Sequence, residues 1–202
     1  MGNNHRSVIF GNGRLHLKFL KEIRKWDYVI GVDRAAYWLI SNNIIPDLAI
    51  GDFDSTSKQE LGVIKERAKS IKIYPRNKNW TDMELALKYA KGETVIFGGS
   101  GTRLDHTLAT LYALKTQVFI DETNRIQKIS KGRTILKPGG YRYVSIIPIT
   151  SSIILSLFGF RYNLTNTKLL RGSTRGISNE ISSRQAVIDL FAGKAWVVES
   201  ND

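Results

Sequence analysis

Leu48-Ala49-Ile50-Gly51-Asp52-Phe53-Asp54-Ser55 joins a short apolar strand to two carboxylates that are one residue apart. In an extended backbone, positions i and i+2 project to the same face, so the spacing predicts that Asp52 and Asp54 converge while Phe53 points into the packing. Two neighbouring carboxylates favour a counter-ion, and Mg2+ takes one or two carboxylates while keeping water for substrate phosphates. The stretch therefore predicts a divalent-metal site. The alternative is an acidic turn that caps the next helix.

Short apolar runs recur on both sides of this stretch through the first 120 residues, and segments with helical patterning separate them. The runs are residues 8–10, 28–32, 48–50, 71–74, 94–97 and 118–120. Alternating strands and helices are typical of a parallel sheet wrapped by helices. The clearest helix begins at Thr81, which forms a capping-box pattern with Glu84. A second helix is expected from Leu104 or Asp105. Its inward residues are expected to be Leu104, Leu108 and Leu111.

After about residue 121 the sequence changes to β-branched runs separated by Gly and Asn turns. The runs are residues 133–136, 141–149, 153–158, 168–170 and 185–190. We expect a boundary within residues 121–130, which gives a first domain of residues 1–121 and a second of residues 122–202. The expected fold class is α/β, with an N-terminal Rossmann-like parallel sheet flanked by helices and a C-terminal all-β sandwich or partial barrel.

Composition excludes several classes of protein. The 202 residues are 42% hydrophobic, which is enough for a buried core, and the formal net charge of +12 is scattered along the chain. The absence of cysteine excludes a disulfide framework and a thiolate zinc site, and it fits a cytoplasmic protein. The start lacks the apolar core of a secretion signal. Pro148 and several Ser and Thr residues interrupt the apolar span 144–160, which predicts two strands and no membrane segment.

Polar or Gly-rich turns follow four of the predicted strands, at residues 11–13, 33–34, 52–54 and 98–101. Because open α/β sheets bind ligands beyond the carboxyl ends of their strands, we expect these turns on one rim. Glycines before a helix let backbone N–H groups approach an anion, so Gly99 and Ser100 are candidate phosphate contacts. Arg103, just beyond them, is placed to neutralise a phosphoryl oxygen, and the alternative is a surface arginine.

Asp82 occupies the first turn of the helix after Thr81, where the helix dipole stabilises a carboxylate by about 0.3–1 kcal/mol. The functional alternative is a third metal ligand or a base that orients an attacking hydroxyl. That alternative requires Asp82 to face Asp52 and Asp54 across the rim.

In their order and spacing, these motifs resemble the thiamine pyrophosphokinase family over nearly the whole chain. The catalytic-domain blocks of that family resemble residues 46–55, 81–87 (Thr-Asp-Met-Glu-Leu-Ala-Leu) and 98–106 (Gly-Gly-Ser-Gly-Thr-Arg-Leu-Asp-His). Its thiamine-domain blocks resemble residues 144–148, 159–164 and 176–180 (Gly-Ile-Ser-Asn-Glu).

The resemblance implies that the terminal pyrophosphoryl group of ATP moves to the hydroxyethyl oxygen of thiamine, giving thiamine diphosphate and AMP. It implies a catalytic first domain, a thiamine-binding second domain, Mg2+ as cofactor, and a homodimer with thiamine between one subunit's rim and the partner's β-domain. The metal ligands implied are Asp52, Asp54 and Asp82. The catalytic residues are Asp54, Asp82, Arg103 and Asp105. The residues implied to bind ATP or thiamine are Asp33, Asp52, Thr81, Gly99, Ser100, Ser178 and Asn179.

This sequence also departs from the family pattern. Asn77 and Asn79 stand where acidic residues are common in the family, which lowers the local acidity. Ile181 offers no aromatic face for thiamine, so Phe160, Tyr162 or Trp196 is left to stack on it.

Two alternative functions fit parts of the sequence. A pyrophosphokinase with the same Mg-nucleotide rim could act on another primary alcohol, such as a hydroxymethylpterin. A nucleic-acid-binding module is suggested by the sequence pI near 9.9 and by aromatic residues in the β-rich part. An aspartate-lined rim and unclustered basic residues argue against that module.

Overall fold

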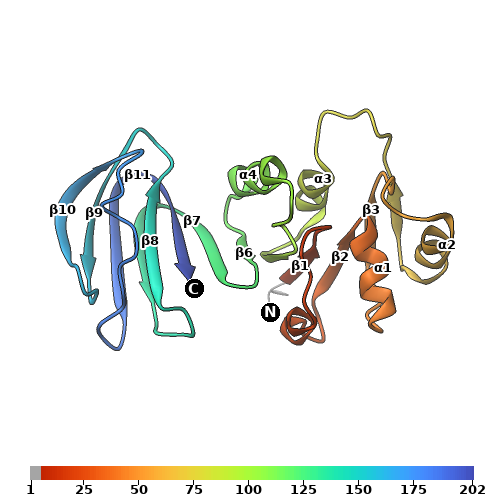
Figure 1. Cartoon of the computed structure of the whole chain (residues 1–202), viewed down its shortest axis with the longest axis horizontal. Coiled ribbons are helices and arrows are strands. Elements are labelled where there is room, and N and C mark those ends of the chain that lie inside the picture. The colour runs from red at the N-terminus through yellow and green to blue at the C-terminus, as the bar shows by residue number, and fades with distance from the viewer. Residues whose placement is uncertain (1–5) are drawn as a thin grey trace. The chain divides into compact units, whose positions relative to one another are not determined.

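The computed structural model describes residues 6–202 and shows a mixed α/β fold (Figure 1). The chain divides into two compact units, one ending at Asp121 and the other beginning at Glu122. No helix among the described residues has the length and apolar character needed to cross a membrane.

The first unit is built on parallel strands in the spatial order β4-β3-β2-β1-β5-β6. Their bounds are β1 Arg6–Phe10, β2 Tyr28–Val32, β3 Leu48–Gly51, β4 Ile71–Ile73, β5 Glu93–Phe97 and β6 Val118–Ile120. Each predicted apolar run of this part is a strand. The chain order reverses between β1 and β5, and at such a switch point the turns beyond the strand ends diverge and leave a crevice.

The helices of the first unit connect these strands (Figure 1). They are η1 Leu17–Glu22, a 3-10 helix, and α1 Arg34–Ser41, α2 Lys58–Arg67, α3 Asp82–Tyr89 and α4 Leu104–Ala113. The predicted capping box of α3 is confirmed. The Thr81 side chain accepts a hydrogen bond from the Glu84 amide at 3.1 Å, and the Glu84 carboxylate accepts one from the Thr81 amide at 3.2 Å. This box fixes where Asp82 begins the helix.

The predicted inward face of α4 is wrong at two of its three residues. Leu104 is 67% exposed and Leu108 is 43% exposed, whereas Thr110 is buried and Leu111 is half-buried. A polar residue can occupy the buried position because the Thr110 hydroxyl donates a hydrogen bond to the His106 carbonyl at 2.9 Å.

The second unit is antiparallel, with β11 at its centre. Its strands are β7 Asn124–Leu136, β8 Tyr143–Pro148, β9 Ser152–Phe158, β10 Leu164–Leu170 and β11 Ala186–Ser200. β11 pairs with β7 along nearly its whole length, with β9 through its first half and with β8 through its second half. The predicted pair of strands within residues 144–160 is confirmed. The runs predicted at 133–136 and 185–190 are only parts of the much longer β7 and β11.

A single apolar cluster fills the second unit and draws on all its strands, with Ile129, Ile146, Leu155, Leu169 and Val197 among its members. In the missed part of β7 the two buried residues, Ile126 and Ile129, are three positions apart with polar residues between them, so no apolar run marks this part. The missed part of β11 contains the apolar run Ala195-Trp196-Val197-Val198, in which only alternate side chains are buried.

Candidate functional site

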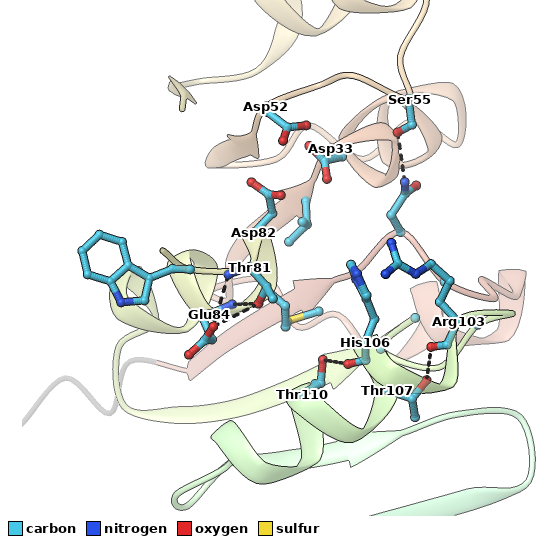
Figure 2. Close-up of a pocket in the computed structure, with 18 of the residues that line it drawn as sticks. Asp33, Asp52, Ser55, Thr81, Asp82, Glu84, Arg103, His106, Thr107 and Thr110 are labelled. Atoms are coloured by element: carbon cyan, nitrogen blue, oxygen red, sulfur yellow. Dashed lines mark hydrogen bonds between the residues drawn. The ribbon is translucent and has the colours of Figure 1, made fainter. Parts of the chain in front are cut away.

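The four turns predicted to share a rim line one pocket of about 700 Å3 in the first unit (Figure 2). Asn12 and Gly13 come from the turn after β1, Asp33 from the end of β2, and Asp52 from the end of β3. Gly98, Gly99 and Gly101 come from the turn after β5. The segment between β4 and α3, together with α4, completes the wall.

Three carboxylates meet inside this pocket. One side-chain oxygen from each of Asp33, Asp52 and Asp82 lies within 4.8 Å of the other two. Figure 2 shows the three side chains pointing toward one another from three separate elements. Of the predicted acidic residues, Asp52 and Asp82 therefore come together with Asp33.

Asp33 holds its place through the backbone of the β3 turn. It occupies the N-cap position of α1 with a positive φ of 47° but makes no side-chain capping bond. It is 9% exposed, and its Oδ1 accepts a hydrogen bond from the Phe53 amide at 3.0 Å. Burial, reinforced by the charge of Asp82, raises the pKa of Asp33 to about 7. Burial beside a second carboxylate therefore favours the protonated form of Asp33.

The predicted convergence of Asp52 and Asp54 on one face of an extended strand is wrong. β3 ends at Gly51, and Phe53 adopts a left-handed φ of 57°, so alternation does not reach Asp54. Phe53 is buried, as predicted, and the Asp54 amide donates a hydrogen bond to Asp52 Oδ1 at 3.2 Å. The Asp54 carboxylate, 46% exposed, lies 3.4 Å from the guanidinium of Arg76. Asp54 lines the pocket but lies outside the group of three.

Lys78 is the residue of this site that the sequence analysis did not single out. Its Nζ lies 2.7 Å from Asp52 Oδ2 and 3.2 Å from Asp82 Oδ1, and its side chain is only 8% exposed. Burial acts to raise the pKa of Asp52, but hydrogen bonds from Lys78 and the Asp54 amide outweigh it and leave that pKa lowered. No periodic pattern marks Lys78, because it lies in an irregular connection before α3, which begins at Asp82.

Asp82 differs from Asp52 because it stays short of partners. Its Oδ1 is buried and forms no aligned hydrogen bond, although the Lys78 ammonium is at ion-pair distance. Burial raises the pKa of Asp82 in spite of that ammonium. A buried carboxylate oxygen that accepts no hydrogen bond, next to two more carboxylates, is a donor set that suits a hard divalent cation such as Mg2+.

The predicted phosphate-binding turn packs against the turn after β1. The Gly13 amide donates to the Gly98 carbonyl and the Arg14 amide donates to the Ser100 carbonyl, both at 2.8 Å. A Cβ atom on Gly13 would lie 2.0 Å from the Ser100 carbonyl oxygen, so this close approach requires glycine. Gly99 lines the pocket, whereas Ser100 lies next to the lining residues and contributes its carbonyl to this packing.

Arg103 and Asp105 form an exposed pair at the start of α4. Arg103 Nε and Nη2 both donate to the Asp105 carboxylate, and these contacts lower the pKa of Asp105. Arg103 lines the pocket, as do Thr81 and His106. Asp105 is not among the described lining residues.

In the second unit, Ser178 and Asn179 have different environments. Ser178 is exposed with a positive φ of 55°, and its amide donates to Ser145 Oγ at 3.0 Å. Asn179 is 8% exposed, and its side-chain amide bonds to both the amide (3.0 Å) and the carbonyl (2.8 Å) of Tyr162. A pocket of about 360 Å3 lies beside them and includes Tyr162, Arg175, Ile177 and Asn179 in its lining.

Comparison with known proteins gives consistent matches along most of the chain. Residues 19–126 match the family model described as thiamin pyrophosphokinase, catalytic domain, and residues 131–193 match thiamin pyrophosphokinase, vitamin B1 binding domain. The thiamine pyrophosphokinase of Bacillus subtilis is 37% identical over 186 residues, which cover 86% of this chain and 87% of that protein.

Solved structures agree. A crystal structure of thiamine pyrophosphokinase from Bacillus subtilis superimposes with a TM-score of 0.90 at 31% identity, covering 98% of this chain and 99% of that one. A thiamin pyrophosphokinase from Geobacillus thermodenitrificans gives a TM-score of 0.88 at 28% identity, with 98% of each chain covered.

Proposed function

The chain belongs to the thiamin pyrophosphokinase family, and from that premise we propose how its residues divide the work. It is an ATP-dependent transferase that moves a pyrophosphoryl group to thiamine, giving thiamine diphosphate. The observation that carries the proposal for the site is the meeting of Asp33, Asp52 and Asp82 in a pocket at the strand ends. Neither the hydroxymethylpterin alternative nor the nucleic-acid-binding alternative is favoured by the family match.

We propose that the first unit is a Rossmann-like nucleotide-binding domain and the second a β-sandwich that binds thiamine. The first contains the whole aspartate pocket, and its residues match the catalytic-domain model. The second contains Ser178 and matches the vitamin B1 binding model.

Mg2+ is the proposed cofactor, with Asp33, Asp52 and Asp82 as its ligands. The close approach of the three carboxylates and the buried Asp82 oxygen that accepts no hydrogen bond support this set. Asp54 stays a predicted ligand, one whose carboxylate would have to leave Arg76 to reach the ion. When bound, Mg2+ supplies charge neutralisation for the triphosphate of ATP.

The reaction leaves little covalent work to the protein. The hydroxyethyl oxygen of thiamine attacks the β-phosphorus of ATP, the bond from that phosphorus to the bridging oxygen of the α-phosphate breaks, AMP leaves with the electron pair, and the hydroxyl proton is released. We propose that Gly99, Ser100 and Thr81 position the phosphates and that Arg103 neutralises charge as the bond breaks. Asp82 is the proposed group that orients the attacking hydroxyl, and Asp105 positions Arg103 through their ion pair.

On the thiamine side, Ser178 is the proposed direct contact because it is exposed beside the pocket of the second unit. Asn179 is proposed to position Tyr162, because its side chain accepts from the Tyr162 amide and donates to the Tyr162 carbonyl. We further propose a cytoplasmic homodimer as the working form.

Product identity tests the function directly. The protein is incubated with thiamine and Mg-ATP, and nucleotides are separated by chromatography. We expect AMP and thiamine diphosphate in equal amounts, with none formed in EDTA. Formation of ADP would refute pyrophosphoryl transfer. AMP release with a hydroxymethylpterin, without any reaction of thiamine, would instead show that thiamine is not the acceptor.

A further inference from the structure

Lys78 is the inward-facing residue of an otherwise exposed connection. It lies between β4 and α3 in a segment without helix or strand, where Pro75, Arg76, Asn77, Asn79 and Trp80 are all exposed. Its own side chain is 8% exposed, and its ammonium group lies against the carboxylates of Asp52 and Asp82. Burying an ammonium is unfavourable unless it is paired, so contact with Asp52 and Asp82 holds this segment against the pocket.

The ammonium pairs with two of the three carboxylates that are proposed to hold a divalent ion. A hard cation such as Mg2+ requires oxygen ligands at about 2.0–2.1 Å in near-octahedral geometry. Nζ already lies 2.7 Å from Asp52 Oδ2 and 3.2 Å from Asp82 Oδ1. Two cations cannot share that position, because their repulsion adds to the steric conflict. Metal binding to Asp52 Oδ2 and Asp82 Oδ1 therefore competes with Lys78.

A displaced Lys78 needs another anion, and the proposed substrate brings one. The pocket that contains its ammonium also contains the Gly-rich turn and Arg103, the groups assigned to phosphate. A metal ion alone provides no anion to replace Asp52 and Asp82 as partners of the ammonium. A metal ion that carries a polyphosphate offers phosphoryl oxygens within the same pocket.

We propose that Lys78 is a built-in counter-ion that occupies the carboxylates of Asp52 and Asp82 until a metal-bound polyphosphate arrives, and then pairs with phosphate. This inference rests on the proposed function of the pocket. The consequence of this pairing is that metal and nucleotide bind together. Free metal must displace the Lys78 ammonium without offering it another anion, whereas a metal–nucleotide complex offers it phosphoryl oxygens. Lys78 is thus a positioning residue that couples the two binding events.

The test measures metal binding with Mn2+ as the probe, read as the loss of the free Mn2+ signal in electron paramagnetic resonance. Titrations are run with and without α,β-methylene-ATP, which cannot be cleaved between its α- and β-phosphorus. The variants are Lys78→Met, which removes the charge, Lys78→Arg, which keeps a cation, and Lys65→Met. Lys65 is an exposed lysine of α2, so its variant controls for the loss of one positive charge.

We expect Lys78→Met to bind Mn2+ without nucleotide at least about tenfold more tightly than the wild type, because the competing ammonium is gone. Lys78→Arg and Lys65→Met should keep weak binding like that of the wild type. The nucleotide analogue should tighten Mn2+ binding strongly in the wild type and much less in Lys78→Met. If Lys78→Met shows no cooperative thermal unfolding, Lys78→Gln takes its place in the same titrations.

Equal Mn2+ affinities for the neutral variant, the wild type and Lys65→Met would overturn the proposal, as would an equal gain from the nucleotide analogue in all of them. The function is scored separately by AMP production in the wild type. AMP production with unchanged Mn2+ affinities would sink only the role of Lys78. Absence of AMP would instead sink the function, while the affinity comparison would still decide the competition for the carboxylates.

Discussion

The carboxylate of Asp33 lies directly against Gly51, since a Cβ atom on Gly51 would come within 1.8 Å of Asp33 Oδ1. The two residues belong to neighbouring strand ends, after β2 and at the end of β3. The same Oδ1 accepts the hydrogen bond from the Phe53 amide two residues beyond Gly51. Because residue 51 has no side chain, the Asp33 carboxylate can hydrogen-bond to the turn that contains Asp52.

Gly51→Ala should break this arrangement. The added methyl group has to displace Asp33, and overpacking of this kind costs about 1–3 kcal/mol of unfolding free energy. Displacement of a ligand by about 1 Å can lower turnover about 100-fold, and we expect a loss of at least that order. Urea unfolding and steady-state kinetics measure the two effects.

Gly62→Ala is the matched control for Gly51→Ala. Gly62 lies inside α2, and an added Cβ there would meet nothing within 4 Å. We expect a gain of about 0.5–1 kcal/mol in stability and unchanged turnover. Wild-type turnover in Gly51→Ala would show that Asp33 does not need its present position.

Substitution of each acidic residue in turn shows how much each contributes to turnover and to Mn2+ affinity. We expect Asp52→Asn and Asp82→Asn to fold and to lower turnover by about 100- to 1000-fold, the range typical for loss of one electrostatic group at a reaction centre. Asp54→Asn should weaken Mn2+ binding less, because its carboxylate must first leave Arg76. Calorimetric Mn2+ titration in the presence of α,β-methylene-ATP gives the ranking. An Asp54→Asn defect equal to that of Asp52→Asn would make Asp54 a full ligand.

The strands of the first unit and the rim of the site could be predicted from sequence. Each short apolar run of that unit is a strand, and a parallel sheet gathers its strand ends at one edge, so turns distant in sequence meet there. The capping box at Thr81 likewise fixed the start of α3, because its two hydrogen bonds depend on local spacing alone.

Backbone conformation and side-chain partners at the site could not be predicted in the same way. The left-handed φ of Phe53 ends the alternation on which the pairing of Asp52 with Asp54 depended. The inward orientation of Lys78 depends on tertiary contacts, because the connection that contains it has no periodic pattern. The face of α4 was misassigned because Thr110 satisfies its hydroxyl within the helix and so can be buried.

The pH dependence of stability should carry the signature of Asp33. Its pKa is about 7 in the folded protein, against an ordinary value of 3.8. Between these values the folded chain holds a proton that the unfolded chain has released, so this group lowers stability as pH rises from about 4 to about 7. Asp33→Asn removes the titration and keeps an oxygen that can accept from the Phe53 amide.

We therefore expect Asp33→Asn to be more stable than the wild type at pH 8 in EDTA, by at most about 4 kcal/mol because each pKa unit is worth about 1.4 kcal/mol. The difference should shrink toward pH 5. Urea unfolding at pH 5, 6, 7 and 8 measures it. A difference that does not vary with pH would mean that Asp33 ionises normally in the folded protein. Turnover should be lost at every pH, because the variant lacks a proposed ligand.

Asn179 and Ser178 provide a matched pair in the second unit, one expected to act through structure and the other through contact. Asn179→Ala leaves the amide and carbonyl of Tyr162 and the amide of Glu180 without the side chain that they bond. Leaving partly buried polar groups unpaired costs about 1–3 kcal/mol each, so the thermal unfolding temperature should fall clearly. KM for thiamine should rise with it, because the Tyr162 segment loses its anchor.

Ser178→Ala should behave differently, because the Ser178 hydroxyl is exposed and alanine keeps both the Cβ atom and the backbone amide that donates to Ser145 Oγ. We expect an unchanged unfolding temperature and a KM for thiamine raised about tenfold, the size of one lost hydrogen bond to a substrate, with KM for ATP unchanged. For both variants, calorimetry measures the unfolding temperature, and kinetics with each substrate varied in turn measure the two KM values. A KM for thiamine equal to that of the wild type in Ser178→Ala would remove Ser178 from the thiamine contacts. A normal unfolding temperature in Asn179→Ala would show that the Tyr162 segment is held by other contacts.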